Sequence, residues 1–292
     1  MNDLSSCIHL PMLSLRAPAK INWFLKIIRK RDDGFHDIVS VMQCVNLYDE
    51  LTFEHADTLE LISDMDIPPV DNIVYRAAAH LKKRTSYRKG ARITLTKNIP
   101  HGAGLGGGSS DAACTLLGLN RLWGLNLNKV EMLSIAAAIG SDVPFFLDGS
   151  CSLVEGRGEK LSPLKMNSSV VLLLVKPSIS VSTADAYASF DRSRTEKLTK
   201  KAIDIKLLVQ VFIRQDFNLY GRLPDNDFEQ VVAAEYPVIR KIKTQLLNSG
   251  AIISAMTGSG SAVYGLFRNR EHAEKSANAM KSYWCRVVDT LI

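Results

Sequence analysis

Residues 100–111 read PHGAGLGGGSSD, and this stretch decides how the rest of the chain is interpreted. Five of the seven residues from 102 to 108 are glycine, which is costly inside a regular element and suits a backbone that approaches a ligand closely. The residues that follow, from about Ser110 to Trp123, are predicted to form a helix, whose free N–H groups and dipole attract anions. The stretch therefore predicts a phosphate-binding loop, in which Ser109 and Ser110 can cap the helix or reach a phosphate or its magnesium.

Three other interpretations of the loop are compared with this one. A P-loop requires Lys directly after its last glycine, and no Lys follows here. Gly102, Gly104 and Gly107 satisfy the dinucleotide pattern G-x-G-x-x-G, but the preceding strand alternates in polarity instead of being apolar throughout. Nor does an acidic residue end a second strand about 20 residues later. A Rossmann oxidoreductase remains the second interpretation, and a flexible connection with a serine cap is the third.

The composition is that of a soluble globular protein, with 46% hydrophobic and 23% charged residues. The 292 residues predict one large or two smaller packed units. The longest apolar run, Val170 to Val175, is far too short to span a bilayer, so we expect no association with a membrane. Residues 1–15 lack a basic n-region, which predicts a short leader before Leu13 instead of a secretory signal.

The cysteines and the net charge bear on compartment and partners. The scattered cysteines form no C-x-x-C pair, which argues against a disulfide framework or a zinc site and favours a reducing, cytoplasmic location. The formal net charge of +6 can attract nucleic acid but can equally serve an anionic metabolite. Because the charges do not form long blocks, we expect no nucleic-acid partner, and an RNA-binding module is kept as an alternative. The cysteines are Cys7, Cys44, Cys114, Cys151 and Cys285.

Strand and helix patterns follow one another without a strict βαβα rhythm, which predicts an α+β fold with two lobes, residues 1–165 and 166–292. Ala91 to Lys97 alternates like a half-buried strand, and Asn128 with Glu131 predicts a capping box. Pro18 is expected to interrupt the first strand. The predicted strands are 13–28, 37–54, 91–97, a hairpin over 149–161, 170–175, 251–256, 262–267 and 285–290, and the predicted helices are 72–83, 110–123, 128–140, 183–190, 203–213, 227–234, 236–248 and 271–283.

Four segments, in order, resemble the motifs of the GHMP kinase superfamily. The glycine-rich stretch resembles its ATP loop, residues 17–22 (APAKIN) its amino-terminal motif, 140–146 (GSDVPFF) its catalytic segment and 257–261 (TGSGS) its carboxy-terminal glycine motif. The resemblance implies a ribosomal-protein-S5-like amino lobe, a ferredoxin-like carboxy lobe, and a substrate site between the lobes. It also implies that ATP, with Mg²⁺, is bound by Pro100, His101, Gly102, Ala103, Gly104, Leu105, Gly106, Gly107, Gly108, Ser109 and Ser110.

Residues 33–36 (DGFH) are similar to one branch of that superfamily. Its members phosphorylate the 2-hydroxyl of a methylerythritol that carries cytidine diphosphate, in the non-mevalonate isoprenoid precursor pathway. Another small-alcohol kinase of the superfamily remains an alternative, and a monomer or a homodimer is expected. For Thr183 and Tyr187, ordinary helix packing and capping is the other interpretation. For residues 258–260 the other interpretation is a tight hairpin. The implied substrate-binding residues are Asn22, Phe35, His36, Met42, Thr183, Tyr187, Gly258, Ser259 and Gly260.

Two residues are candidates for the chemistry. Asp142 lies between a helix end and a proline, so it can be either a general base on a loop or a helix N-cap. The resemblance implies the general base, assisted by Lys20, whose alternative is a solvent-facing strand lysine. Asn22 lies two positions after Lys20 and is therefore expected on the same strand face. Asp111 can favour the helix dipole or assist magnesium, and no protein ligand of the metal is assigned.

Overall fold

The computed structural model describes residues 12–193, 210, 214 and 226–292. The predicted leader, Cys7 and nearly all of the helix predicted over 203–213 lie outside these residues. The other predicted helices and strands lie within them and are compared with the structure below.

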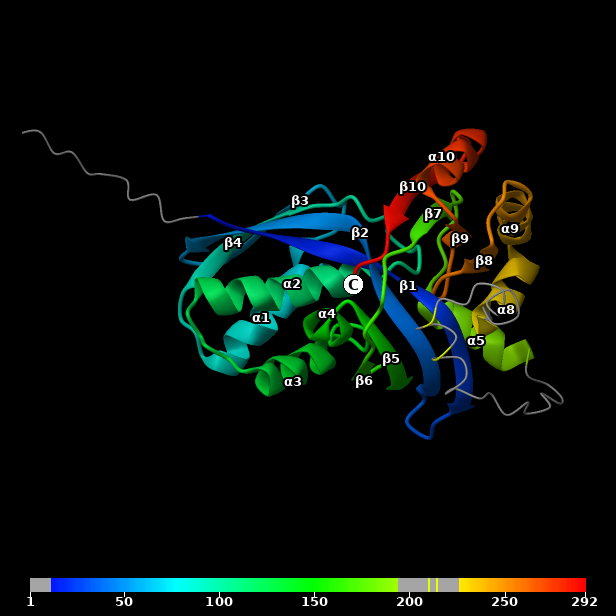
Figure 1. Cartoon of the computed structure of the whole chain (residues 1–292). Coiled ribbons are helices and arrows are strands. Elements are labelled where there is room, and N and C mark those ends of the chain that lie inside the picture. The colour runs from blue at the N-terminus through cyan, green and yellow to red at the C-terminus, as the bar shows by residue number, and fades with distance from the viewer. Residues whose placement is uncertain (1–11, 194–209, 211–213, 215–225) are drawn as a thin grey trace, which may run out of the picture. The chain divides into compact units, whose positions relative to one another are not determined.

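The described residues form two compact units, each of which combines segments that are distant in the sequence (Figure 1). The division of the chain into two domains at residue 165 stays a prediction. Of the described residues, the first unit contains 12–17, 48–98 and 108–147, and the second contains 18–47, 99–107, 148–193, 210, 214 and 226–292.

The first unit is built around strand β4 (Gly90–Thr96), which lies between β3 (Leu59–Ser63) and the end of β2 (His36–Ala56). Strand β4 pairs antiparallel with β2 and parallel with β3. Its alternation is confirmed, because Ala91, Ile93 and Leu95 are buried, whereas the residues between them are at least partly exposed. Strand β3 has no strong pattern of its own and adds to the predicted strands.

Helices bury the apolar side of this unit. Helix α3 begins with the predicted capping box: Asn128 accepts from the Glu131 backbone, and the Glu131 side chain accepts from the Asn128 backbone. Helix α2 begins at Gly107, three residues earlier than predicted, so Ser109 and Ser110 lie in its first turn and do not cap it. The helical elements are η1 (Pro69–Asp71), α1 (Ile73–Thr85), α2 (Gly107–Leu122), α3 (Lys129–Ile139) and α4 (Phe145–Asp148).

The second unit receives the greater part of β1 (Leu13–Lys30) and the first part of β2. Strand β1 continues through Pro18, contrary to the expected interruption; a proline is tolerated in a strand where no ladder donor is required. The predicted hairpin is confirmed, because β5 (Cys151–Gly156) pairs antiparallel with β6 (Lys160–Pro163). Strand β5 also pairs antiparallel with β2.

A four-stranded antiparallel sheet, in the order β10-β7-β9-β8, completes the second unit. Leu172 and Leu174 of β7 pack into one core cluster, and Leu173 and Val175 into another. Both faces of β7 are therefore covered, which accounts for its continuous apolar sequence. The elements are β7 (Val171–Lys176), α5 (Thr183–Ser193), α8 (Asp227–Glu235), α9 (Val238–Asn248), β8 (Ile253–Met256), β9 (Val263–Phe267), α10 (Arg270–Ala279) and β10 (Trp284–Asp289).

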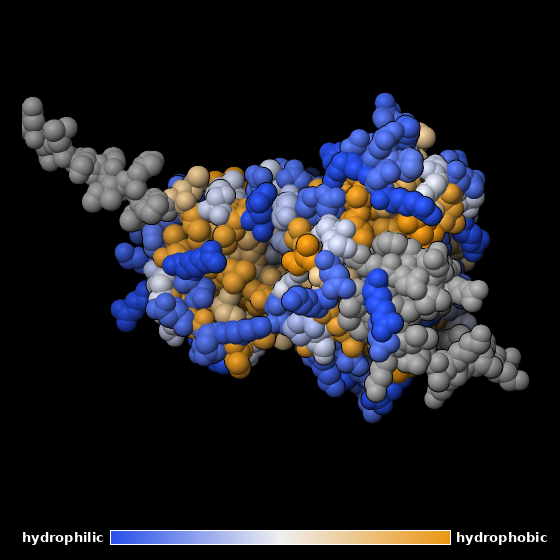
Figure 2. Space-filling model, in the orientation of Figure 1, coloured by the Kyte–Doolittle hydropathy of each residue, from blue (hydrophilic) through white to orange (hydrophobic). Residues whose placement is uncertain are grey.

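The visible surface is mixed in polarity. In Figure 2, hydrophilic residues in blue project from the described part of the chain, and hydrophobic residues in orange lie between them. Among the described residues, none of the helices has both the length and the apolar character that crossing a bilayer requires.

The described cysteines are free thiols. Cys44, Cys114 and Cys151 are buried, and burial raises the pKa of each to about 12. Cys285 is half-buried, and its pKa is also raised by burial. Because the thiolate is the reactive form, these residues are packing elements and not nucleophiles near neutral pH.

Candidate functional site

The glycine-rich loop turns back on the carboxy-terminal glycine motif within the second unit. Gly104 has a φ of 73°, and a Cβ added there would lie 2.2 Å from the backbone oxygen of Thr257. Gly258 has a φ of 56°, and a Cβ there would lie 2.8 Å from the backbone oxygen of Gly104. Both the positive φ angles and the close approach require glycine. Two of the four sequence motifs are thus in direct contact.

Backbone hydrogen bonds extend this junction to the amino-terminal motif. The Lys20 N–H donates to the Leu105 carbonyl at 2.9 Å, and the Ala262 N–H donates to the Ala103 carbonyl at 3.0 Å. Strand β1, the glycine-rich loop and the residues after the β8–β9 turn therefore form one connected structure. The predicted positions His101 and Pro100 lie at the start of the loop, with His101 exposed and Pro100 partly exposed.

Lys20 and Asn22 occupy the centre of this junction. Lys20 is only 3% exposed, and its Nζ donates to Asn22 Oδ1 at 2.6 Å and to the Gly104 carbonyl at 2.9 Å. The Asn22 Nδ2 donates to Ser40 Oγ, and the Asn22 N–H donates to Thr257 Oγ1. The contact between the two side chains confirms that they share a strand face. A solvent-facing role for Lys20 is wrong, because the side chain is buried.

Asp142 lies in the first unit, on the turn between α3 and α4. Helix α4 begins at Phe145, three residues later, so Asp142 does not occupy its N-cap position. Its partly exposed side chain is compatible with contact to a ligand. Lys20 belongs to the second unit, so the pairing of Lys20 with Asp142 stays a prediction.

The first unit contains a buried ionic cluster, of which sequence analysis singled out Asp111 but not its two partners. Lys97, just after β4, forms ion pairs with Asp49 of β2 and with Asp111 near the start of α2, at 2.7 Å from Asp111 Oδ2. Asp49 Oδ1 also accepts from the Asn98 backbone at 2.6 Å. The cluster therefore fixes the start of α2 to the interior of β2 and to the end of β4.

Burial dominates the electrostatics of this cluster. Burial raises the pKa of Asp111 to about 7, against the attraction of Lys97 and with the repulsion of Asp49. Burial lowers the pKa of Lys97, but the two carboxylates outweigh it and raise that pKa above its ordinary value. Asp111 Oδ1 and Ser110 Oγ are buried without a hydrogen-bond partner in the described part of the chain. Such buried oxygens are costly unless they are satisfied by a ligand or water.

Helix α5 presents a line of polar and aromatic contacts within the second unit. Thr183 Oγ1 lies 2.9 Å from Ser259 Oγ, and Tyr187 stacks on His36 with ring centroids 4.5 Å apart and an interplanar angle of 16°. Asp191 Oδ1 lies 2.8 Å from His36 Nε2. Thr183, Tyr187 and Asp191 are spaced by four residues, so they share one helix face. That spacing, counted on from Tyr187, is the sequence signal that could have identified Asp191.

The other predicted substrate residues differ in accessibility. Phe35 is 50% exposed, and the Arg157 guanidinium lies over its ring at 4.6 Å from the centroid. Met42 is only 2% exposed in the interior of β2. Gly258, Ser259 and Gly260 form the turn between two antiparallel strands, so the tight-hairpin interpretation describes their backbone correctly.

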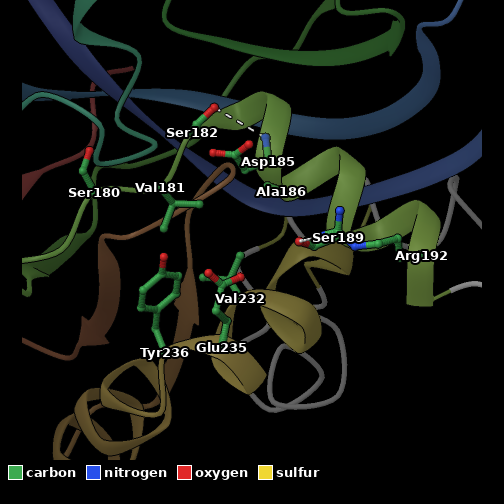
Figure 3. A pocket seen from close by; sticks show the side chains of 10 residues that line it. All are labelled: Ser180, Val181, Ser182, Asp185, Ala186, Ser189, Arg192, Val232, Glu235 and Tyr236. Carbon is green, nitrogen blue, oxygen red and sulfur yellow. Dashed lines mark hydrogen bonds between the residues drawn. The ribbon is translucent and has the colours of Figure 1, made fainter.

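A separate pocket of the second unit is lined largely by residues of α5 and α8 (Figure 3). In this pocket Arg192 donates to Ser189 Oγ at 2.8 Å. None of the predicted site residues lines it. Among the residues that the structure describes, no group of three or more His, Cys, Asp or Glu is arranged to hold a metal ion. The pocket is lined by Ser180, Val181, Ser182, Asp185, Ala186, Ser189, Arg192, Val232, Glu235 and Tyr236.

Comparisons with known proteins agree with the motifs. The model of the GHMP kinases N terminal domain matches residues 72–150, and that of the GHMP kinases C terminal domain matches residues 208–284. A 4-diphosphocytidyl-2-C-methyl-D-erythritol kinase of Thermodesulfovibrio yellowstonii is 45% identical over 286 residues, which cover 96% of this chain and 99% of that protein. One of Chlorobium phaeobacteroides is 41% identical over 276 residues, which cover 93% and 95%.

Solved structures show the same architecture. The crystal structure of a 4-(cytidine 5'-diphospho)-2C-methyl-D-erythritol kinase matches with a TM-score of 0.78 and 28% identity, over 94% of this chain and 99% of that one. A homoserine kinase from Cytophaga hutchinsonii matches with a TM-score of 0.77 at 21% identity, over 96% and 95%, and so shares the fold. The α+β, two-lobed GHMP kinase fold expected from the motifs is confirmed.

Proposed function

The chain belongs to the family of 4-diphosphocytidyl-2-C-methyl-D-erythritol kinases, and from this premise we propose that it transfers the terminal phosphoryl group of ATP to the 2-hydroxyl of that cytidyl alcohol. The observation that carries the proposal is the 45% identity to a relative of that name over almost the entire chain. The contact between the glycine-rich loop, Lys20 and the carboxy-terminal glycine motif supports it, because all three kinase motifs in the second unit meet there.

ATP is held by residues 100–110. The backbone amides of the loop and the start of α2 supply donors for phosphate oxygens, and the helix dipole favours negative charge at that end. The absence of a lysine after the last glycine means that backbone groups carry more of this binding than in a P-loop.

The phosphoryl transfer uses Asp142 as general base and Lys20 as an electrostatic partner. A carboxylate on a partly exposed turn can take the proton of the acceptor hydroxyl. The Lys20 ammonium, which donates to Asn22 Oδ1 and to the Gly104 carbonyl, provides a fixed positive charge for the transferring group. Asn22 orients the diol of the substrate with its side-chain amide.

The cytidine diphosphate end binds at Phe35, His36 and Tyr187. The half-exposed Phe35 ring offers a stacking surface for a base, an interaction worth roughly 1–3 kcal/mol. Thr183 with the Gly258–Gly260 turn lies at the phosphate side. Met42, which is buried in β2, contributes an apolar side chain to the same site.

Mg²⁺ accompanies ATP in this proposal and neutralises phosphate charge when bound. The unpartnered buried oxygens Ser110 Oγ and Asp111 Oδ1 fit such a cation, because Mg²⁺ prefers oxygen ligands. Their place near the start of α2 adjoins the proposed phosphate site in sequence. The partner is thus a small molecule that carries cytidine diphosphate, with no nucleic acid; we further propose a cytoplasmic monomer or homodimer with domains 1–165 and 166–292.

The experiment that tests this function is ADP release from MgATP in the presence of 4-diphosphocytidyl-2-C-methyl-D-erythritol, with mass spectrometry of the product. A product heavier by one phosphoryl group, formed only with substrate, supports the proposal. Turnover with homoserine or mevalonate instead would assign the chain to another GHMP activity. RNA binding that weakens steeply with salt, without ATP turnover, would favour the binding-module alternative.

A further inference from the structure

Asp191 connects three elements of the second unit at the predicted nucleoside site. Its Oδ1 lies 2.8 Å from His36 Nε2, and its Oδ2 accepts from Lys30 Nζ at 2.7 Å. His36 begins β2, Lys30 ends β1, and Asp191 lies near the end of α5. The carboxylate therefore joins the helix to both ends of the β1–β2 connection, which contains Phe35.

The protonation of this pair follows from its neighbours. Partial burial raises the pKa of Asp191, but hydrogen bonds from Lys30 and His36 outweigh it and hold that pKa below its ordinary value. An ionised carboxylate can only accept hydrogen bonds, so His36 Nε2 must carry a proton and donate it. Lys30 pairs with the other oxygen of the same carboxylate, so both oxygens of Asp191 are engaged.

The other face of His36 is equally constrained. The ring stacks on Tyr187, and Tyr187 in turn packs edge-on against Phe228, with centroids 4.7 Å apart. Phe228 is 2% exposed, so the platform behind Tyr187 is part of the core. The His36 side chain, 5% exposed, is held both by a hydrogen bond at its edge and by a stack on its face.

We propose that Asp191 is a positioning residue for cytidine recognition: it holds the His36 ring in the Nε2–H tautomer against Tyr187 and so fixes the Phe35–His36 segment that receives the base. This inference rests on the proposed function. Asp191 therefore affects the affinity for the nucleoside end of the substrate and leaves the affinity for ATP unchanged. The residue acts through His36 and does not itself contact the substrate.

Two variants separate this role from simple anchoring of α5. Asp191→Asn keeps the shape of the side chain but removes the charge that fixes the tautomer. Lys30→Met removes the ion pair between β1 and α5 and leaves the bond between Asp191 and His36. Asp185→Asn, an exposed position on the same helix, is the surface control.

The measurements are the affinities of each variant for CDP and for ATP by calorimetry, and the ¹⁵N shifts of the His36 ring, assigned with His36→Gln. For Asp191→Asn we expect CDP affinity to fall roughly tenfold, the effect of one lost charge-assisted hydrogen bond, with ATP affinity unchanged. We expect the wild-type spectrum to show a proton on Nε2, as donation to Asp191 requires. Lys30→Met and Asp185→Asn retain CDP affinity.

Three results would overturn the inference. Equal losses of CDP affinity in Asp191→Asn and Lys30→Met would mean that Asp191 only anchors the helix. Parallel losses for CDP and ATP would indicate a general structural defect, and an unchanged CDP affinity in Asp191→Asn would remove the role altogether. A wild-type protein that neither binds CDP nor turns over the cytidyl alcohol would instead refute the proposed function, and this inference with it.

Discussion

Lys20 Nζ donates to Asn22 Oδ1 at 2.6 Å. Both residues are buried, and each is only 3% exposed. The second acceptor of this ammonium is the backbone carbonyl of Gly104. These two hydrogen bonds fix the direction of the ammonium within the junction of the glycine-rich loop, β1 and the carboxy-terminal turn. A positive charge that is held in a fixed position can stabilise a transferring phosphoryl group.

Replacing Lys20 by Met should therefore separate activity from stability. We expect kcat to fall about 100-fold or more, the size found when one group that stabilises a transition state is removed. The melting temperature should change less, because methionine fills most of the buried space of the lysine stem. Steady-state kinetics and thermal unfolding test this. Lys26→Met, on the same strand and paired with Asp227, serves as the control and should retain kcat.

Asp142→Asn should abolish turnover while it spares ATP binding. Loss of a general base typically costs 10²- to 10⁴-fold in rate. Asp142 lies on a turn and does not cap α4, and asparagine keeps the size of its side chain, so we expect the variant to fold. Single-turnover kinetics and ATP calorimetry measure the two quantities. If ATP affinity falls together with the rate, Asp142 has a structural role; Asp148→Asn, on the neighbouring helix, is the matched variant.

Gly104→Ala should damage both stability and ATP binding. The added methyl group would lie 2.2 Å from the Thr257 carbonyl, so the loop or the carboxy-terminal turn must move. Gly124→Ala is the matched control: its φ of 62° is similarly strained, but nothing lies within 4 Å of the added Cβ. We expect a cost of about 1 kcal/mol at Gly124 and a larger one at Gly104, by chemical denaturation. Equal costs would show that the contact with Thr257 is unimportant.

Asp111 makes the stability of the protein dependent on pH. Its pKa is raised in the folded state to about 7, so the folded protein binds more protons here than the unfolded chain does between roughly pH 4 and 7. The stabilising contribution of this group is present below the unfolded pKa and is lost as pH rises to 7. Asp111→Asn should thus gain stability relative to wild type across that range, by a few kcal/mol at most.

Denaturant unfolding of wild type and Asp111→Asn at pH 5 and pH 7.5 measures this difference. The exposed Asp64→Asn serves as control and should show no such trend. A difference that is constant with pH would mean that Asp111 stays ionised in the folded protein. Lys97 contributes in another range, because a raised lysine pKa gives stability that is lost only above the ordinary lysine pKa.

Local patterns predict local structure well in this chain. The alternation of β4, the capping box of α3 and the apolar run of β7 each depend on interactions between near neighbours or on burial, and each is confirmed. The predicted start of α2 is three residues too late because Gly107 and Gly108 are poor helix formers. They are helical nevertheless, because they lead directly into the helix that follows.

The parts of the candidate site that sequence reasoning missed join residues that are far apart in the chain. His36 and Asp191 are 155 positions apart, and Asp49 and Lys97 are 48 apart. His36 lies in the DGFH segment, and Asp191 is indicated only by its spacing from Tyr187. Asp49 and Lys97, in contrast, do not differ from ordinary surface residues in their local sequences. Charge pairing of this kind appears only when the strands and helices have been placed together.

The buried thiols have a practical consequence for following the reaction. With pKa values of about 12, Cys44, Cys114 and Cys151 contribute almost no thiolate near neutral pH. A cysteine introduced at an exposed position beside the nucleoside site, such as Asp32, would therefore react with a maleimide dye far faster than these three. The native fold thus offers a low labelling background at these sites for a fluorescent reporter of substrate arrival, with the native side chains of the core left unchanged.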